Sequence, residues 1–218
     1  MIIYLGIPMY GGAHGLTVSC LLSLQKHLIT SGHEVITDIV ANGSILTKVR
    51  NGIVKRFIES KANKLLFLDS DMVFEPEQVA KLINAQFDVS IINYRAKHNQ
   101  VKYFSEPILK DGEPTGVCID GEAWLETEQG GTGIMCISRK AITEMIAAYP
   151  ELTYKDNGPT PALFDFQLKD GQYYGEDYTF CQRFRAIGGQ IFMLADAETG
   201  HIGTTVYHGN YHDYLRGH

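Results

Sequence analysis

Short apolar runs alternate with stretches of helical periodicity through the first half of the chain. These runs predict four strands, at residues 2–8, 34–40, 64–68 and 88–93. Between the first two, Leu21, Leu24 and Leu28 recur at intervals of three or four residues, which predicts an intervening helix. The run 64–68 is entirely apolar after its lysine, as expected of a strand covered on both faces. This strand–helix alternation predicts a parallel sheet of the nucleotide-binding type.

Residues that favour helix ends mark the expected helices. Gly32 favours a C-terminal stop for the first helix. Ser44 is an N-cap candidate for a second helix that continues to about residue 60. Pro76 suits the first turn of a third helix.

The second half of the chain has a different pattern. Extended segments separated by turns are expected over 103–126, a strand at 133–138, a long loop around Pro159 and Pro161, a helix over 178–187 and a last strand at 190–194. No linker-like stretch or internal repeat divides the chain. We therefore expect one α/β domain with a mostly parallel central sheet, helices on its faces and a mixed second half.

Composition and charge narrow the possible functions. A chain of 218 residues with 44% hydrophobic residues is long enough to bury a full core without disulfides. The formal net charge of −6 argues against a generic nucleic-acid binder, which would carry a basic surplus. No apolar run of membrane-spanning length occurs, and the first eight residues suit a strand better than a signal peptide. The four cysteines lack metal-ligand spacing and favour a reducing compartment.

Two carboxylates follow the apolar strand 64–68. Residues at i and i+2 of an extended chain point the same way, so Asp69 and Asp71 are expected to address one cation. Carboxylate oxygens suit Mg²⁺ or Mn²⁺, which proteins often hold together with substrate phosphates. A polar turn at the end of a strand explains the same D-x-D pattern equally well.

Further polar segments occur in the second half. Glu176 and Asp177 open a predicted helix, where acids are also favoured by the helix dipole. The glycines of 130–133 allow a close backbone approach to a ligand, and equally a simple turn. His201 is expected in a loop after the last strand, between two glycines. Three other histidines are expected at the surface, namely His208, His212 and His218.

Taken together, these segments resemble the GT-A glycosyltransferases, which use nucleotide-sugar donors with a D-x-D motif. Within that group the chain looks most like the small enzymes of bacteria and large DNA viruses. The segments that carry the resemblance are Ile7-Pro8-Met9-Tyr10, Val49-Arg50-Asn51-Gly52, Phe67-Leu68-Asp69-Ser70-Asp71, Asn93-Tyr94-Arg95-Ala96-Lys97, Gly131-Thr132-Gly133-Ile134-Met135, Gly175-Glu176-Asp177 and His201-Ile202-Gly203.

The resemblance implies one GT-A domain over residues 1–218. Residues 1–97 would form the nucleotide-sugar-binding half and 98–218 the acceptor and catalytic half. It also implies a cytoplasmic location, in the host cell if a virus encodes the chain.

The resemblance further implies individual roles. Asp71 would bind Mn²⁺ or Mg²⁺ directly, His201 would complete the coordination, and Asp69 would contact the metal or the donor ribose. Asp177 would be the general base, with Glu176 beside it. Pro8, Met9 and Tyr10 would line the pocket for the nucleotide base. Asp38 would hydrogen-bond the nucleotide base or the ribose. Arg50 and Lys97 would face the sugar or the diphosphate of the donor. The remaining donor-binding candidates are Asn51, Ser70 and Gly133.

The implied function is metal-dependent transfer of a sugar from a nucleotide-diphosphate donor, with UDP the commoner nucleotide, to a glycan or other hydroxyl acceptor, with inversion. Trp124 and the Tyr173-Tyr174 pair are candidates for an acceptor platform, and Trp124 suits the core equally well.

Two alternative functions remain open. A haloacid-dehalogenase-type phosphatase would use Asp69 as its nucleophile, and a non-catalytic domain would only bind a nucleotide sugar or carbohydrate.

Overall fold

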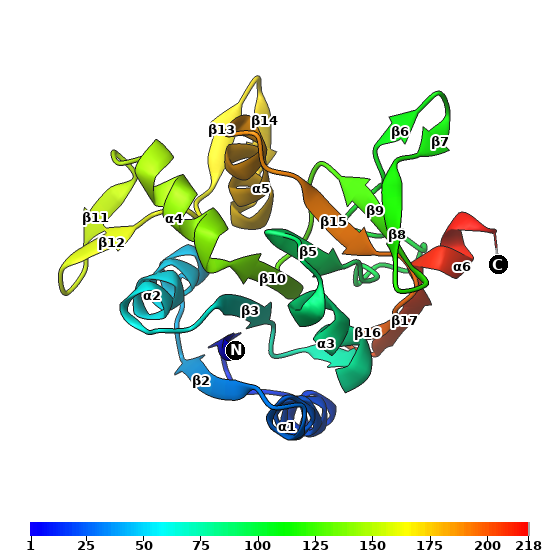
Figure 1. Ribbon diagram of the computed structural model, residues 1–218, viewed down its shortest axis with the longest axis horizontal. Coiled ribbons are helices and arrows are strands. Elements are labelled where there is room, and N and C mark those ends of the chain that lie inside the picture. Colours follow the sequence, from blue (N-terminus) through cyan, green and yellow to red (C-terminus); the bar gives the residue numbers. More distant parts are fainter. Residues whose placement is uncertain (218) are drawn as a thin grey trace.

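The computed structural model describes residues 1–217 and is built on a central eight-stranded sheet. Its strands are β1 (Ile2–Met9), β2 (Glu34–Ala41), β3 (Lys64–Leu68), β5 (Val89–Ile92), β8 (Gly116–Ile119), β9 (Glu122–Thr127), β10 (Ile134–Ser138) and β15 (Ile191–Leu194). The order across the sheet is β2-β1-β3-β10-β5-β15-β9-β8 (Figure 1). β1 pairs in parallel with β2 and β3, and β15 with β5, whereas β10 and β9 run in the opposite direction. The expected α/β fold with a mostly parallel central sheet is confirmed.

Helices cover both faces of this sheet. They are α1 (Gly15–Thr30), α2 (Leu46–Glu59), α3 (Pro76–Asn84), α4 (Arg139–Ala148) and α5 (Glu176–Ala186), with a short α6 (Tyr211–Leu215) near the end. α2, α4 and α5 bury Phe57, Met145 and Phe180 in one apolar core. α1 and α3 bury Leu24 and Leu82 in a second core on the opposite face, as the ribbon shows (Figure 1).

β3 demonstrates how the sequence serves both cores. Its side chains alternate, so that Leu65 and Phe67 belong to one core while Leu66 and Leu68 belong to the other. All four are fully buried, and each such side chain contributes roughly 1.5–3 kcal/mol relative to an exposed position. This confirms the expectation of a strand covered on both faces.

A smaller antiparallel sheet lies beside the central one. It has the order β17-β16-β4, formed by β4 (Met72–Phe74), β16 (Glu198–Ile202) and β17 (Val206–Asn210). The expectation of a loop around His201 is wrong, because this residue lies within β16 and pairs with Met72. The pairing joins segments well over a hundred residues apart, which local periodicity does not register. It brings His201 next to the chain that follows Asp71.

Three hairpins complete the second half, and they differ in part from expectation. They are β6–β7 (Leu109–Lys110, Glu113–Pro114), β11–β12 (Thr153–Lys155, Pro159–Pro161) and β13–β14 (Gln167–Lys169, Gln172–Tyr174). The prolines expected in a long loop therefore form an edge strand, where a missing N–H is tolerated. α5 starts at Glu176 rather than 178, and α2 is preceded by Ile45 without a side-chain cap, so Ser44 is not its N-cap.

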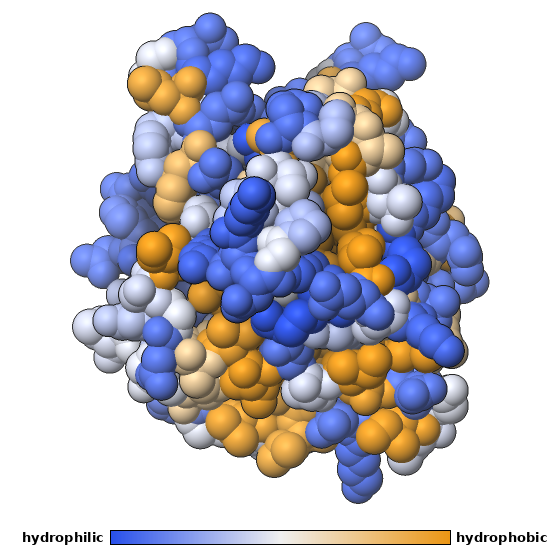
Figure 2. All heavy atoms as spheres, turned by 90° about the vertical axis from the view of Figure 1, so that its left-hand side faces the viewer, coloured by the Kyte–Doolittle hydropathy of each residue, from blue (hydrophilic) through white to orange (hydrophobic). Residues whose placement is uncertain are grey.

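The surface is apolar over part of one side. Figure 2 shows hydrophobic residues gathered in its lower half, the region that Figure 1 assigns to β2 and α1. Leu22, Ile29 and Ile39 of these elements are about half exposed or more. None of the helices within residues 1–217 is both long and apolar enough to span a membrane. His208 is exposed and His212 half-buried, whereas His218 lies outside the described residues.

Candidate active site

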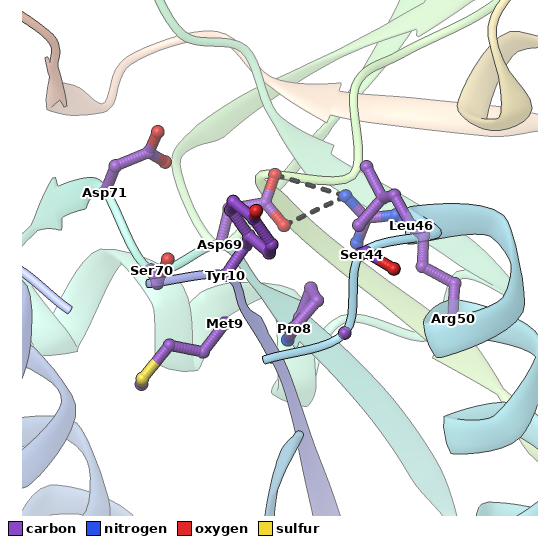
Figure 3. A pocket seen from close by; sticks show the side chains of 10 residues that line it. Pro8, Met9, Tyr10, Ser44, Leu46, Arg50, Asp69, Ser70 and Asp71 are labelled. Atoms are coloured by element: carbon purple, nitrogen blue, oxygen red, sulfur yellow. Dashed lines mark hydrogen bonds and ion pairs between the residues drawn. The ribbon is translucent and has the colours of Figure 1, made fainter. Parts of the chain in front are cut away.

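A cavity of about 300 Å³ opens at the C-terminal ends of β1 and β3 (Figure 3). This is the edge at which open α/β sheets bind ligands. Pro8, Met9 and Tyr10 line it at the end of β1, and Asp69, Ser70 and Asp71 line it after β3. The remaining wall comes from the start of α2 and the segment before it, through Gly43, Ser44, Leu46 and Arg50.

A buried arginine links two of the candidate acids. Arg50 is 2% exposed, and its Nη2 donates to Asp69 Oδ1 at 2.9 Å and Oδ2 at 3.2 Å. Its Nε donates to Glu176 Oε1 at 3.2 Å. Burial of the guanidinium opposes its charge, but Asp69 and Glu176 outweigh that effect and raise the pKa of Arg50. The ring of Phe67 lies below the guanidinium, 5.4 Å away. Arg50 therefore ties α2, the D-x-D turn and α5 together.

Asp69 is also held through its backbone. Its N–H donates to Gly133 O at 3.0 Å, and the Gly133 N–H donates to Tyr94 Oη at 3.1 Å. A Cβ on Gly133 would stand 2.6 Å from Tyr94 Cζ, so the close approach requires glycine. Burial, together with the charges of Asp69 and Asp177, keeps the pKa of Tyr94 well above its usual value. Tyr94 thus lies between the cavity wall and the start of α5.

Asp71 belongs to a second group of charged side chains, separate from the Arg50, Asp69 and Glu176 group. Its Oδ2 pairs with Lys97 Nζ and lies 3.6 Å from His201 Nε2. His201 Nδ1 is 3.0 Å from the backbone oxygen of Arg95 and must donate to it, so Nε2 is the ring nitrogen that faces Asp71. Burial acts to raise the pKa of Asp71, but hydrogen bonds from His201 and Lys97 lower it to about 2.

The two carboxylates of the D-x-D motif point apart. Asp69 turns toward Arg50 while Asp71 points to the other side of the cavity (Figure 3). The expectation of parallel side chains is wrong, because residues 69–71 form a turn in which the Met72 N–H bonds Asp69 O at 3.3 Å. Across residues 1–217, no group of three or more His, Cys, Asp or Glu side chains is placed to share one metal ion.

A smaller set of ligands still fits a divalent cation. Asp71 offers a carboxylate and His201 offers Nε2 of a ring that is oriented through Nδ1, the arrangement usual for metal-ligating histidines. Mg²⁺ and Mn²⁺ are often held by one or two protein groups together with substrate phosphates. The residues present therefore fit a cation shared with a phosphorylated ligand, without Asp69.

Asp177 occupies the first turn of α5 and is half-buried. Burial, reinforced by the neighbouring charge of Glu176, raises its pKa to about 6. Its Oδ1 accepts a hydrogen bond of 2.8 Å from the Tyr178 N–H. Glu176 is 7% exposed and is engaged by Arg50, so of the two acids Asp177 is the one free to exchange a proton.

Two donor-binding candidates lie away from the cavity. Asp38 is inside β2 opposite Gly6, where its Oδ2 accepts from Tyr4 Oη at 2.8 Å and Arg56 Nε at 2.9 Å. The strand continues for three residues beyond Asp38, to Ala41. Asn51 is buried and exchanges two hydrogen bonds with the backbone of Phe164, which gives it a structural role.

Of the aromatic candidates for an acceptor platform, one is buried in the core and another is exposed. Trp124 is 3% exposed and packs against Phe87 at 5.0 Å, so it belongs to the core. Tyr173 is 69% exposed on β14 and stacks on Phe166, with ring centroids 5.4 Å apart. Of the two candidates compared, Tyr173 is therefore the one exposed to solvent.

Several residues of the site were given no role in it by the sequence. Tyr94 accepts the hydrogen bond of the Gly133 N–H, whereas the sequence marked it only as part of the segment 93–97. Ser44 and Leu46 line the cavity, whereas the pattern suggested only a helix start. The one available indication was position, because both follow the C-terminal end of a parallel strand.

The sequence matches no protein-family model and no curated protein. Among solved structures, A197 from STIV superposes with a TM-score of 0.54 at 18% identity, over 93% of this chain and 86% of that one. A glycosyltransferase involved in glycosylation of the major capsid of PBCV-1 gives a TM-score of 0.37 at 10% identity, over 68% and 67% of the two chains. A nucleoside-diphosphate-sugar pyrophosphorylase from Vibrio cholerae gives 0.45 at 10% identity, over 89% and 91%. TM-scores below 0.5 do not establish a common fold, whereas the similarity to A197 shows that this chain shares the fold of that protein.

Proposed function

We propose that the chain is a GT-A glycosyltransferase that moves a sugar from a nucleotide-diphosphate donor, with a UDP-sugar the first choice, to a hydroxyl of a glycan or similar acceptor. The proposal includes dependence on Mn²⁺ or Mg²⁺ and inversion at the anomeric carbon. It rests on one observation. A nucleoside-sized cavity at the C-terminal edge of the parallel strands contains Asp71, which pairs with His201, and Arg50 connects Asp69 on its wall to Glu176, the neighbour of Asp177.

The cavity supports the donor assignment by size and lining. About 300 Å³ is at the lower end of the range for small-molecule pockets and suits a nucleoside. Pro8 and Tyr10 offer apolar and aromatic surface for a base, and Ser70 offers a hydroxyl for the ribose or phosphate. Asp71, at the far side of the cavity, would then stand near the diphosphate. Residues 1–97 supply every lining group, which agrees with a donor-binding role for that half.

Asp71 and His201 would hold the cation. When bound, such an ion offsets the negative charge that grows on the leaving diphosphate. Arg50 lines the cavity from α2. It is a positioning residue that holds the carboxylates of Asp69 and Glu176 in fixed places.

Asp177 would take the proton from the acceptor hydroxyl. The acceptor oxygen then bonds the anomeric carbon, the bond from that carbon to the phosphate oxygen breaks, and the nucleoside diphosphate leaves with the electron pair. A pKa of about 6 leaves the carboxylate ionised at pH 7 and makes it a stronger base than an ordinary aspartate. Attack from the side opposite the leaving group gives inversion.

The structure weighs against the phosphatase alternative. Both oxygens of Asp69 accept hydrogen bonds from Arg50 Nη2, and these bonds stabilise the carboxylate and lower its nucleophilicity.

Screening nucleotide sugars by thermal shift, with and without Mn²⁺, followed by a transfer assay with the ligands that stabilise the protein, tests the proposal. We expect one nucleotide class to raise the melting temperature in the presence of Mn²⁺ and to support transfer. Binding without turnover would favour the non-catalytic alternative, and a phosphorylated Asp69 would favour the phosphatase.

A further inference from the structure

Lys97 occupies the side of Asp71 on which a cation would bind. Its ammonium group is paired with Asp71 Oδ2, the same oxygen that lies 3.6 Å from His201 Nε2. Both partners of the ion pair are about one third exposed, so the pair can open without rearranging the core. The carboxylate thus already has a positive counter-ion in the free protein.

The position of Lys97 is built into the fold. Its loop is closed at the base by the Ala96 N–H, which bonds Lys102 O at 2.8 Å. Its aliphatic stem passes Gly203, the residue after β16, where a Cβ would stand 3.2 Å from Lys97 Cδ. Gly203 has an ordinary backbone conformation, so its missing side chain serves to leave room for the lysine. The residues that carry His201 therefore also seat Lys97.

A lysine and a divalent cation compete for one carboxylate. Two positive groups on the same oxygen repel each other, so the ammonium must leave when the metal arrives. Lys97 has a flexible four-carbon stem, so its ammonium group can move away from Asp71. The move costs little free energy if the ammonium finds another anionic partner. A diphosphate in the cavity beside Asp71 provides that partner.

We propose that Lys97 is an internal counter-ion that competes with the metal for the Asp71 carboxylate until a diphosphate binds. Binding of the metal and binding of the diphosphate are then coupled. The inference rests on the proposed function, because it requires both a cation and a nucleoside diphosphate as ligands. Coupling of this kind is reciprocal: the metal strengthens diphosphate binding by the same factor. Without a diphosphate, the protein then binds the metal only weakly.

Titration of Mn²⁺ into the protein, with free Mn²⁺ followed by electron paramagnetic resonance, tests this directly. Without nucleotide, Lys97→Met should bind Mn²⁺ roughly fivefold more tightly than the wild type, the factor that about 1 kcal/mol of lost ion pairing gives. Gly203→Ala, which crowds the stem but keeps every ligand, should change the affinity in the same direction. Lys140→Met is the matched control, because its ion pair with Asp88 lies outside the cavity, and it should have no effect.

The same titrations with UDP, GDP, CDP or ADP present test the coupling. In the wild type, the nucleotide that binds should tighten Mn²⁺ binding, and in Lys97→Met that gain should shrink by the same factor of roughly five. Unchanged or weaker Mn²⁺ binding by Lys97→Met would overturn the inference, as would an equal effect of Lys140→Met. Such a result leaves the proposed function intact if the wild type transfers sugar with Mn²⁺. Absence of Mn²⁺ binding by every protein, with and without nucleotides, would overturn the inference and remove the metal from the proposed function as well.

Discussion

Asp177→Asn separates the chemical role of Asp177 from its effect on stability. The ionised carboxylate is disfavoured in the folded protein, because burial and Glu176 raise its pKa from 3.8 to about 6. Asparagine keeps an oxygen for the Tyr178 N–H and removes the charge. We therefore expect a variant that is more stable than the wild type at neutral pH and inactive in transfer.

The size of the effect follows from the pKa. The folded state holds the Asp177 proton up to about pH 6, whereas the unfolded chain loses it near pH 3.8. The wild type should thus lose stability as pH rises between these values, and the loss is complete above them. A shift of about two units at 1.36 kcal/mol each gives about 3 kcal/mol at most. Asp177→Asn should show no such loss.

Urea unfolding of both proteins between pH 4 and 8 measures this difference. The stability gap should be near zero at pH 4, grow up to about pH 6 and stay constant above pH 7. Asp88→Asn is the control with the opposite sign, because hydrogen bonds from Lys140 and Ser138 outweigh burial and lower the pKa of Asp88. A gap for Asp177→Asn that does not change with pH would refute the reasoning. Transfer should fall by about 10²–10⁴-fold while donor binding is retained.

Further predictions concern the pH profile and the supports of the site. Wild-type kcat/KM should fall as pH drops below about 6, as Asp177 takes up its proton, and a profile flat to pH 4.5 would contradict its role as base. Asn51→Ala should cost about 1–3 kcal/mol in urea unfolding, because it leaves the buried backbone of Phe164 without partners. Gly133→Ala should cost about 1–3 kcal/mol by displacing Tyr94, and should also weaken donor binding in a thermal-shift titration, because Gly133 O holds Asp69. Equal donor binding in that variant would show that Asp69 does not depend on this support.

The sequence was informative where the structure depends on local pattern. The apolar run 64–68 predicts a strand buried on both faces, and its successive side chains do enter two different cores. Pro76 predicts the start of α3 because its missing N–H and fixed φ suit that position. These features need no knowledge of distant partners.

The site was less predictable because it depends on pairing across the chain. His201 is placed by β4, and nothing near it in sequence encodes that neighbour. Asp69 and Asp71 diverge because residues 69–71 turn, and because Arg50 draws one carboxylate away from the other. The residue types of the site could therefore be chosen from the sequence. The sequence could not predict that they form two separate groups of charged side chains, one around Arg50 and one around Asp71.

The position of β10 has a consequence for how the chain folds. This strand comes from the second half, yet it lies between β3 and β5, with Ile134 opposite Leu68 and Met135 opposite Ile91. A fragment of residues 1–97 would leave two inner strands with open hydrogen-bonding edges and no shared partner. The cavity wall after β3 can thus become rigid only after some 70 further residues have been synthesised and have returned to the sheet, which slows folding through the entropy of closing that loop. The chain should consequently fold and unfold as a single cooperative unit, without a stable nucleotide-binding intermediate.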